Sequence, residues 1–312
     1  MIFIPTCSHD ATTDLLLPFL EGEADIFRFD IDRFREYRWD ESTEGLSIGD
    51  SSGKVLTDRS LSCYYLRKPM FFEDLDVPKG GLLENWCREE VSDWIHDLYN
   101  QCAAAGLCAL VHPGRGAWRK PRQMHLAAKF FNVPEWHLVQ GSLPPLPPGK
   151  RWVVKTLTQT KIGDDKFLFV RKVDPSRLDP SYPWFLQEAV EGETDETVVY
   201  VAGRTFAYAS PRDPSHHMDS RRNYAEFRPV WSPGELSEAE RKAIRGFMAE
   251  AGLSFGRFDF IRKDGVLHFL EVNPNGQWAW LDEKDERGLV SAVAEEILAV
   301  ERRGRTLAAA RD

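Results

Sequence analysis

Three residues near the C-terminal end of the chain have side chains suited to a hard metal ion. Asp259 lies in an apolar stretch, residues 255–261, while Glu271 and Asn273 end a second one, residues 267–273. Two carboxylates and a carboxamide offer only oxygen ligands, and Mg²⁺ takes a few of these and completes its shell with phosphates and water. Unpaired acids among aromatic strands are costly, so a cation is expected nearby. Alternatively, these are polar strand ends hydrogen-bonded to a neighbouring loop.

The turn between the two stretches decides which way the acids point. Residues 263–265 contain Asp-Gly, which is a strong signal for a hairpin turn. A two-residue turn would pair Asp259 with Leu270 and would leave Glu271 on the opposite face of the hairpin. This register would separate the two carboxylates.

A three-residue turn, with its glycine in the left-handed conformation, is the register that we predict. It pairs Asp259 with Phe269 and Arg257 with Glu271. Arg257, Asp259, Glu271 and Asn273 then share one face of the hairpin, and the other face is wholly apolar. We prefer this register because it separates polar from apolar side chains.

Hydrophobic periodicity predicts the elements that position these residues. The first part of the chain alternates strands and helices, which is typical of an open α/β unit. The expected strands there are residues 2–4, 26–29 and 62–66, and the helices are 11–20 and 83–105. Further along we expect a helix at 120–131, strands at 152–155, 166–170, 184–190 and 197–201, a helix from a capping box at 232–235 to Gly252, and a last helix at 284–299 before a frayed tail.

Composition excludes several classes of protein. The 312 residues suffice for two or three domains, and the net charge of −9 argues against general binding to nucleic acid or anionic membranes. The five cysteines lack metal-site spacing, as is typical of reduced thiols in the cytosol. Neither a signal peptide nor an apolar run of about 18 residues is present. We expect a soluble, cytoplasmic protein.

Two motifs carry a resemblance to a known superfamily. FGRFDF at residues 255–260 and FLEVNPNGQW at 269–278 resemble the metal-binding end of ATP-grasp ligases. Within that superfamily, they and YLRKP at 65–69 most resemble the microviridin-type (graspetide) maturases of ribosomal peptides. The resemblance implies a mixed α/β and α+β ATP-grasp fold with an N-terminal open α/β domain (1–112). Two α+β lobes, a small central one (113–190) and a C-terminal one (191–312), would clasp ATP.

The resemblance also implies where ATP binds. Lys155, which ends the strand at 152–155, corresponds to a lysine that holds phosphate oxygens, and Lys120 corresponds to an earlier one. A flexible ammonium suits a triphosphate that moves. Alternatively, both are ordinary exposed lysines.

The segment at 185–190 resembles the hinge between two ATP-grasp lobes. Its backbone, Val190 included, would bond the adenine edge, and Gln187 or Glu188 would accept from the exocyclic amine. Asp195 is placed to accept from the ribose hydroxyls.

The sequence departs from the resemblance at Thr197. Related enzymes commonly carry an arginine there, so another arginine must take the catalytic role that is implied. Arg212, Arg222 and Arg257 are the candidates. We favour Arg257 because of the face that it is predicted to occupy.

These features imply an ATP- and Mg²⁺-dependent ligase that activates an Asp or Glu carboxylate of a precursor peptide as an acyl phosphate. A side-chain hydroxyl or amine would then form an intramolecular ester or amide, and the polar loop 156–165 would close over the intermediate. The basic stretch 208–227 suits an acidic peptide or is a solvated loop. A glutathione synthetase-like ligase and a non-catalytic, ATP-binding peptide-docking protein are the alternatives; a homodimer is a further expectation.

Overall fold

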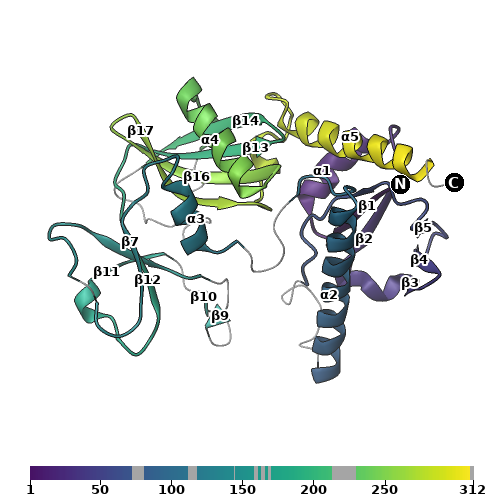
Figure 1. The fold of residues 1–312 in the computed structure, drawn as a ribbon, viewed down its shortest axis with the longest axis horizontal. Helices are drawn as coiled ribbons and strands as arrows, with labels where there is room; N and C mark the ends of the chain where they lie inside the picture. The colour runs from purple at the N-terminus through teal and green to yellow at the C-terminus, as the bar shows by residue number, and fades with distance from the viewer. Residues whose placement is uncertain are drawn as a thin grey trace.

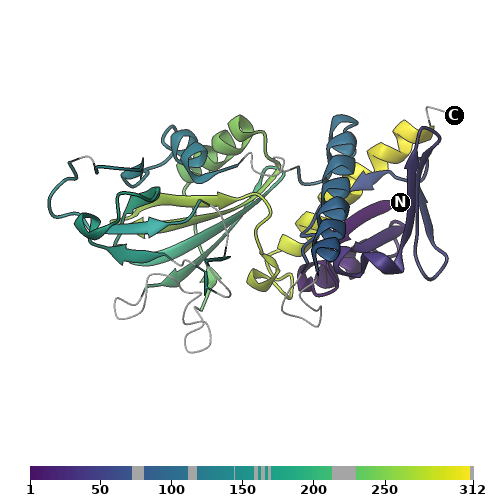
Figure 2. The same ribbon diagram turned by 90° about the horizontal axis from the view of Figure 1, so that it is seen from below.

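The computed structural model describes residues 1–71, 81–111, 118–143, 145–157, 161–162, 166–167, 170–212 and 230–309. The N-terminal elements and the last helix lie on one side of the molecule, and two antiparallel sheets lie on the other (Figure 1). The view turned by 90° shows the same separation (Figure 2). None of the helices in the described ranges is long and apolar enough to cross a membrane.

The N-terminal unit is built on a parallel sheet, as the alternating pattern predicts. The order is β2 (Ile26–Asp30), β1 (Ile2–Thr6), β6 (Cys63–Tyr64). Successive residues of β1 point to opposite faces. Phe3 therefore packs towards α2 (Leu82–Ala104), and Ile2 and Ile4 pack towards α1 (Ala11–Leu20). The 3₁₀ helix η1 (Ile31–Glu36) and the small sheet of β3 (Arg38–Ser42), β4 (Gly45–Gly49) and β5 (Val55–Thr57) were not predicted.

The last helix, α5 (Leu289–Ala309), returns to this N-terminal unit and contacts α1 and β6. It begins five residues later than expected and continues to residue 309, so the expected fraying from residue 302 is wrong. A contact with the chain before β6 and an ion pair within the helix explain the extra turns. Glu301 is buried and accepts a hydrogen bond from Ser62 Oγ at 3.1 Å, and Arg305 pairs with Glu301 at 2.9 Å.

Gly304 is the point where α5 approaches the chain before β6 most closely. A Cβ atom at this position would lie 1.9 Å from the backbone oxygen of Ser62. We expect Gly304→Ala to lower the free energy of unfolding by about 1–3 kcal/mol, because this overpacking outweighs the better helix propensity of alanine. Urea denaturation measures the change. The exposed neighbour Arg303→Ala is the control, with an expected change within about 0.5 kcal/mol. A Gly304→Ala protein as stable as the parent would contradict this packing.

A four-stranded antiparallel sheet follows in the chain. Its order is β11 (Arg171–Val173), β8 (Trp152–Lys155), β12 (Trp184–Glu188), β7 (Trp136–Val139). β8 pairs with β11 and β12. In the described part of the predicted strand at 166–170, the short β10 (Lys166–Phe167) pairs with β9 (Lys161–Ile162). One face of the sheet has its own small core of Trp152, Val154 and Leu186. The 3₁₀ helix η2 (Pro175–Arg177) precedes β12.

The five-stranded antiparallel sheet carries the predicted acids. Its order is β15 (Ser232–Pro233), β14 (Arg204–Pro211), β13 (Thr194–Val201), β16 (Phe255–Lys263), β17 (Val266–Asn273). Helix α4 (Glu238–Ala251) and helix α3 (Lys120–Ala127) cover its apolar face. The capping box of α4 is formed by Ser237 and Glu240 and not at 232–235, where β15 lies. The predicted end at Gly252 is confirmed, with φ +68°. The 3₁₀ helix η4 (Ala279–Leu281) follows β17.

Candidate active site

The β16–β17 hairpin combines a tight turn with a β-bulge. Lys263 pairs with Val266, so the turn has two residues, Asp264 and Gly265, with φ of 50° and 77°. Positive φ at both positions is typical of a type I′ turn, for which Asp-Gly is a favoured sequence. The predicted three-residue turn is therefore wrong.

The bulge places the two acids on one face despite this turn. Phe260 pairs with Phe269, but Asp259 pairs with Glu271, which leaves Leu270 as an extra residue in β17. An extra residue in one strand turns the following side chains over. Asn273 then pairs with Arg257, so the four polar residues share a face as predicted, although their pairing partners differ from those expected.

The apolar side of the same hairpin holds the face in place. Phe258, Phe260 and Phe269 are buried and pack with Phe247 of α4. Burial of several aromatic side chains contributes strongly to packing, because each removes a large apolar area from water. The strands that carry the polar face are therefore held in place by a packed apolar core.

Each acid of the pair has cationic or hydrogen-bonding partners. Arg257 Nη2 lies 3.0 Å from Asp259 Oδ2, and Thr197 Oγ1 donates to Asp259 Oδ1 at 3.2 Å. Lys120 Nζ lies 3.0 Å from Glu271 Oε2. The Asp259 and Glu271 side chains keep 28% and 32% of their surface exposed, so a ligand can reach both.

The pKa values of the two carboxyl groups are shifted in opposite directions. Burial raises the pKa of Asp259; Arg257 opposes this effect and the charge of Glu271 adds to it. Burial also acts to raise the pKa of Glu271, but the ammonium groups of Lys120 and Lys155 outweigh it and lower that pKa to about 2. Glu271 is therefore anionic at neutral pH, and both lysines act on it.

The donors on this face fit a magnesium ion. Asn273 contributes a carboxamide whose Oδ1 accepts from the backbone N–H of Asn275 at 3.3 Å and has a second lone pair. In the described ranges no three His, Cys, Asp or Glu side chains gather as a metal site, so an ion here would have two carboxylates and one amide. Oxygen ligands in this number, completed by phosphates and water, suit Mg²⁺; zinc sites use nitrogen or sulfur more often.

Both predicted lysines reach this face from the side of α3 and the four-stranded sheet. Lys120 is the first residue of α3, and the side-chain oxygen of Gln123 in the same helix accepts from the backbone N–H of Val272 at 2.9 Å. That bond fixes α3 to β17 next to Glu271. Lys155 ends β8, opposite Phe185 of β12.

Comparisons with known proteins bear on the fold that carries these residues. No protein-family model matches the sequence, and no curated protein matches it either. Solved structures do match. The macrocyclase MdnC of Microcystis aeruginosa MRC, bound to precursor peptide MdnA, has a TM-score of 0.76 at 22% identity, with 96% of this chain and 99% of that chain covered. A Chryseobacterium gregarium RiPP-associated ATP-grasp ligase, in complex with ADP and a leader and core peptide, has a TM-score of 0.77 at 15% identity and 96% of both chains. This chain has the ATP-grasp fold.

A more distant ATP-grasp structure also matches over the full length. The D-alanine–D-alanine ligase of Bacillus anthracis has a TM-score of 0.56 at 13% identity, with 98% of each chain covered. The fold match confirms the mixed α/β and α+β class predicted from the sequence. It concerns the arrangement of the elements, and the roles of individual residues follow only from their own contacts.

The predicted adenine-binding residues of this ATP-grasp fold differ in their surroundings. Gln187 is buried in β12 and donates to Met124 Sδ at 3.5 Å, whereas Glu188 pairs with Lys150 at 2.8 Å. Neighbouring side chains of a strand point to opposite faces, so Gln187 and Glu188 lie on different faces of the sheet. Val190, after the strand, is buried.

The three arginines predicted as catalytic candidates differ in their contacts. Arg257 contacts Asp259 and also donates to the backbone oxygen of Gln277 at 3.0 Å. Arg212 Nη1 pairs with Asp195 Oδ1 at 2.6 Å, beside the acid pair. Burial raises the pKa of Asp195, Arg212 opposes this effect, and the charge of Asp259 adds to it. Arg222 lies outside the described residues.

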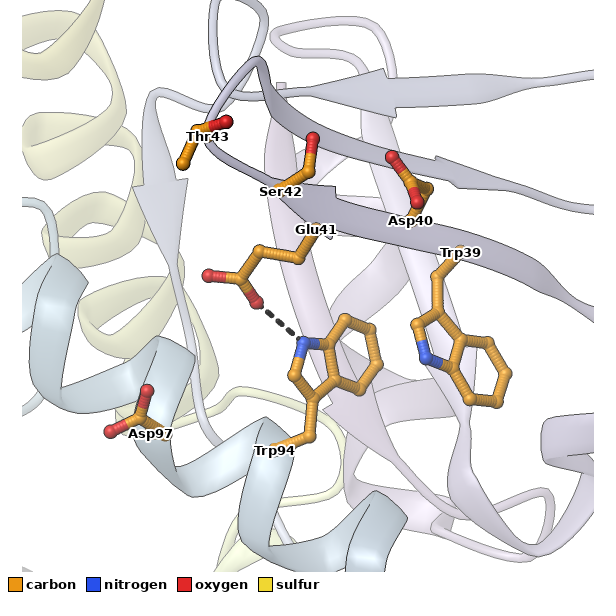
Figure 3. Close-up of a pocket in the computed structure, with 7 residues that line it drawn as sticks. All are labelled: Trp39, Asp40, Glu41, Ser42, Thr43, Trp94 and Asp97. Carbon is orange, nitrogen blue, oxygen red and sulfur yellow. Dashed lines mark hydrogen bonds between the residues drawn. The ribbon is translucent and has the colours of Figure 1, made fainter.

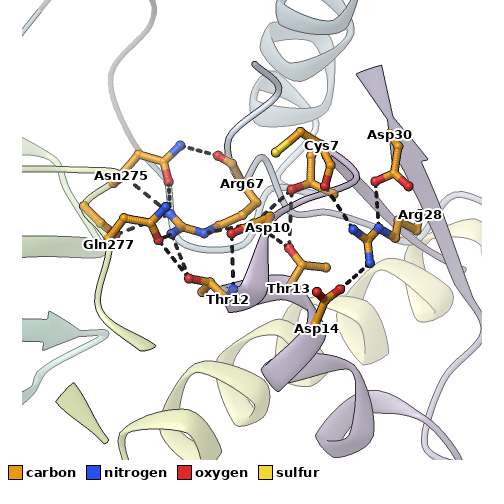
Figure 4. A network of polar contacts seen from close by, with 12 residues as sticks. Cys7, Asp10, Thr12, Thr13, Asp14, Arg28, Asp30, Arg67, Asn275 and Gln277 are labelled. Carbon is orange, nitrogen blue, oxygen red and sulfur yellow. Dashed lines mark hydrogen bonds and ion pairs between the residues drawn. The ribbon is translucent and has the colours of Figure 1, made fainter. Parts of the chain in front are cut away.

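Arg67 lies next to the candidate site, and its contacts were not predicted from the sequence. Its side chain is buried and joins the N-terminal unit to the segment after Asn273 (Figure 4). Arg67 Nη1 donates to Asn275 Oδ1 at 2.6 Å, Nη2 donates to Gln277, and Nε lies 3.5 Å from Asp10. YLRKP drew attention to this position, but its partners Asn275 and Gln277 are more than 200 residues away in the chain. No local pattern could identify them.

A concave region lies in the N-terminal unit, between β3 and α2. Trp39 stacks on Trp94 with ring centroids 5.1 Å apart, and Glu41 accepts from Trp94 Nε1 at 2.7 Å (Figure 3). None of its lining residues belongs to the acid-bearing face. We assign it no catalytic role.

Proposed function

We propose that this chain is an ADP-forming ligase that activates a peptide carboxylate and joins it to a hydroxyl or amine of the same peptide. The observation that carries the proposal is the acid-bearing face, on which Asp259 and Glu271 lie opposite each other with Asn273 beside them. The charges of Lys120 and Lys155 both lower the pKa of Glu271. Such a set of oxygen donors and ammonium groups matches the charge of a metal–triphosphate complex.

The residues have separate tasks in this proposal. Asp259, Glu271 and Asn273 would hold Mg²⁺, which draws negative charge from the phosphate oxygens when bound. Lys120 and Lys155 neutralise further phosphate oxygens. The segment with Gln187, Glu188 and Val190 borders the adenine, and Asp195 accepts from the ribose; these four nucleotide contacts remain predictions.

The chemistry proceeds in two displacements. A carboxylate oxygen of the peptide attacks the γ-phosphorus, the bond to the β-phosphate oxygen breaks, and ADP leaves. A hydroxyl or amine then attacks the acyl carbon of the acyl phosphate, its proton passes to solvent or phosphate, and inorganic phosphate leaves. Positioning and charge stabilisation are the main contributions of a protein to such phosphoryl transfers. Arg257 is the proposed arginine for the developing charge.

Two similar structures support a peptide substrate. MdnC was crystallised with a precursor peptide, and the Chryseobacterium ligase with ADP and a leader and core peptide. Most of the predicted loop 156–165, and residues 213–227 of the basic stretch, lie outside the described residues, so neither adds support. The cytoplasmic location and the homodimer remain predictions.

A mass-resolved turnover assay tests the proposal. The protein is incubated with ATP, Mg²⁺ and an acidic peptide encoded beside its gene. We expect ADP to form only with the peptide, and the peptide to lose the mass of one water per bond formed. ADP release with free amino acids would favour the small-substrate ligase. Peptide binding with neither ADP nor a mass change would contradict the ligase proposal and favour the docking protein.

A further inference from the structure

Lys68 has an unusual position for a charged side chain. It directly follows Arg67 and is partly buried. In the described part of the chain its ammonium forms no hydrogen bond or ion pair. Burying a charge without a counter-ion costs free energy. The position of Lys68 therefore suits the binding of an anionic ligand.

The surroundings of Lys68 are cationic. Burial lowers its pKa, and the charges of Arg67 and Arg257 lower it further, to about 8, against the opposing effect of Asp10. Both guanidinium groups are already held, Arg67 by its bonds to residues 275–277 and Arg257 by Asp259. Nε of Arg257 is nonetheless buried and has no acceptor among the described residues. Positive charge therefore exceeds negative charge around Lys68.

Gln277 connects this cationic region to the acid-bearing face. Its side-chain oxygen accepts from Arg67, and its backbone oxygen accepts from Arg257. Lys68 thus approaches Arg257 from the N-terminal unit, whereas Lys120 approaches Glu271 from α3, at 3.0 Å. The charges of Lys120, Lys155 and Arg257 all lower the pKa of Glu271. Two groups of cations flank the acid pair.

We propose that Lys68, together with Arg257, binds the substrate carboxylate that receives the phosphoryl group. This inference rests on the function proposed above, which places the ATP phosphates with Lys120 and Lys155. In phosphoryl transfer the attacking and leaving oxygens lie roughly in line on opposite sides of phosphorus. The attacking carboxylate therefore belongs on the side away from the nucleotide lysines, which is the side of Lys68.

Steady-state kinetics of Lys68→Met separates this role from nucleotide binding. We expect KM for the peptide to rise by about 10- to 100-fold, the loss expected for one hydrogen bond between charged groups, with KM for ATP unchanged. Lys68→Arg should restore part of the affinity. Lys129→Met is the matched control, because Lys129 is exposed and pairs only with Glu250 in the described structure. An unchanged peptide KM, or a rise in KM for ATP instead, overturns the inference.

Chemical labelling tests the site even if no turnover is found. Acetylation of Lys68 by acetic anhydride is followed by peptide mass, with and without the acidic peptide. We expect protection of about tenfold or more by the peptide, little by Mg-ATP, and little by a peptide whose acids are replaced with amides. Protection by Mg-ATP alone, or by neither ligand, contradicts the inference. An inactive protein whose Lys68 is protected by the peptide would refute the ligase proposal and leave the carboxylate site standing.

Discussion

Glu271→Gln is expected to lower the rate of ADP formation by about 100- to 1000-fold or more, as does the loss of one preorganised charge-stabilising group in other active sites. The amide keeps the size of the side chain but removes the negative charge opposite Asp259. It therefore weakens the proposed Mg²⁺ site and leaves the ammonium groups of Lys120 and Lys155 without the carboxylate that they surround. Coupled measurement of ADP release with saturating peptide gives the rate.

The structure offers a matched control for this substitution. Glu250 also pairs with a lysine, Lys129, but it lies on the surface of α4 away from the acid pair. Glu250→Gln should keep the rate within about twofold, because exposed ion pairs contribute little. Thermal unfolding confirms that both variants are folded. A folded Glu271→Gln protein with the rate of the parent would refute the metal assignment.

Arg67→Met is expected to lower the free energy of unfolding by about 3–5 kcal/mol, because removing one partner of a buried ion pair leaves the other charge uncompensated. Asp10 is buried and would lose its nearby guanidinium. The change also removes the donors to Asn275 and Gln277. Since these residues directly follow Asn273, we expect ADP formation to fall in parallel with stability. Urea denaturation, with attention to the midpoint, measures the first effect.

Arg28→Met is the control for Arg67→Met. Arg28 contacts two carboxylates, Asp14 and Asp30, but 22% of its side chain is exposed, whereas Arg67 is buried. Its loss should cost about 1–2 kcal/mol, less than the loss of Arg67, because solvent partly screens its ion pairs. If the two variants had the same urea midpoint, Arg67 could not be the buried connection between the N-terminal unit and the segment at 275–277.

The face that carries the acids could be predicted because the hairpin alternates strictly. Phenylalanines at 258 and 260 had to point away from Arg257 and Asp259, and the apolar core fixed which side was buried. The turn could not be predicted by the same reasoning. Asp264-Gly265 forms a type I′ turn, and the bulge at Leu270 then places Asp259 and Glu271 on the same face. No residue type in the sequence indicates a bulge.

Long-range contacts account for the other differences. The end of α5 depends on the contact of Glu301 with Ser62, which is 239 residues away in the chain, so the local sequence did not indicate that the helix continues. Arg67 was noted only as part of a motif, because its partners in the segment at 275–277 become neighbours on folding. Lys120 and Lys155 were named through resemblance, and their shared effect on Glu271 could only come from the folded chain.

The bulge at Leu270 has a consequence for how sequences of this kind are aligned. The turn and the bulge are independent, so the hairpin tip can lengthen or shorten by two residues and leave both acids on the same face. An odd change does the same if the turn takes up the additional residue, but it turns Glu271 and Asn273 over if the strand pairing shifts by one residue. What the sheet requires is therefore the pairing of the two acids across the hairpin. An alignment that demands a constant number of residues there would miss chains with the same geometry.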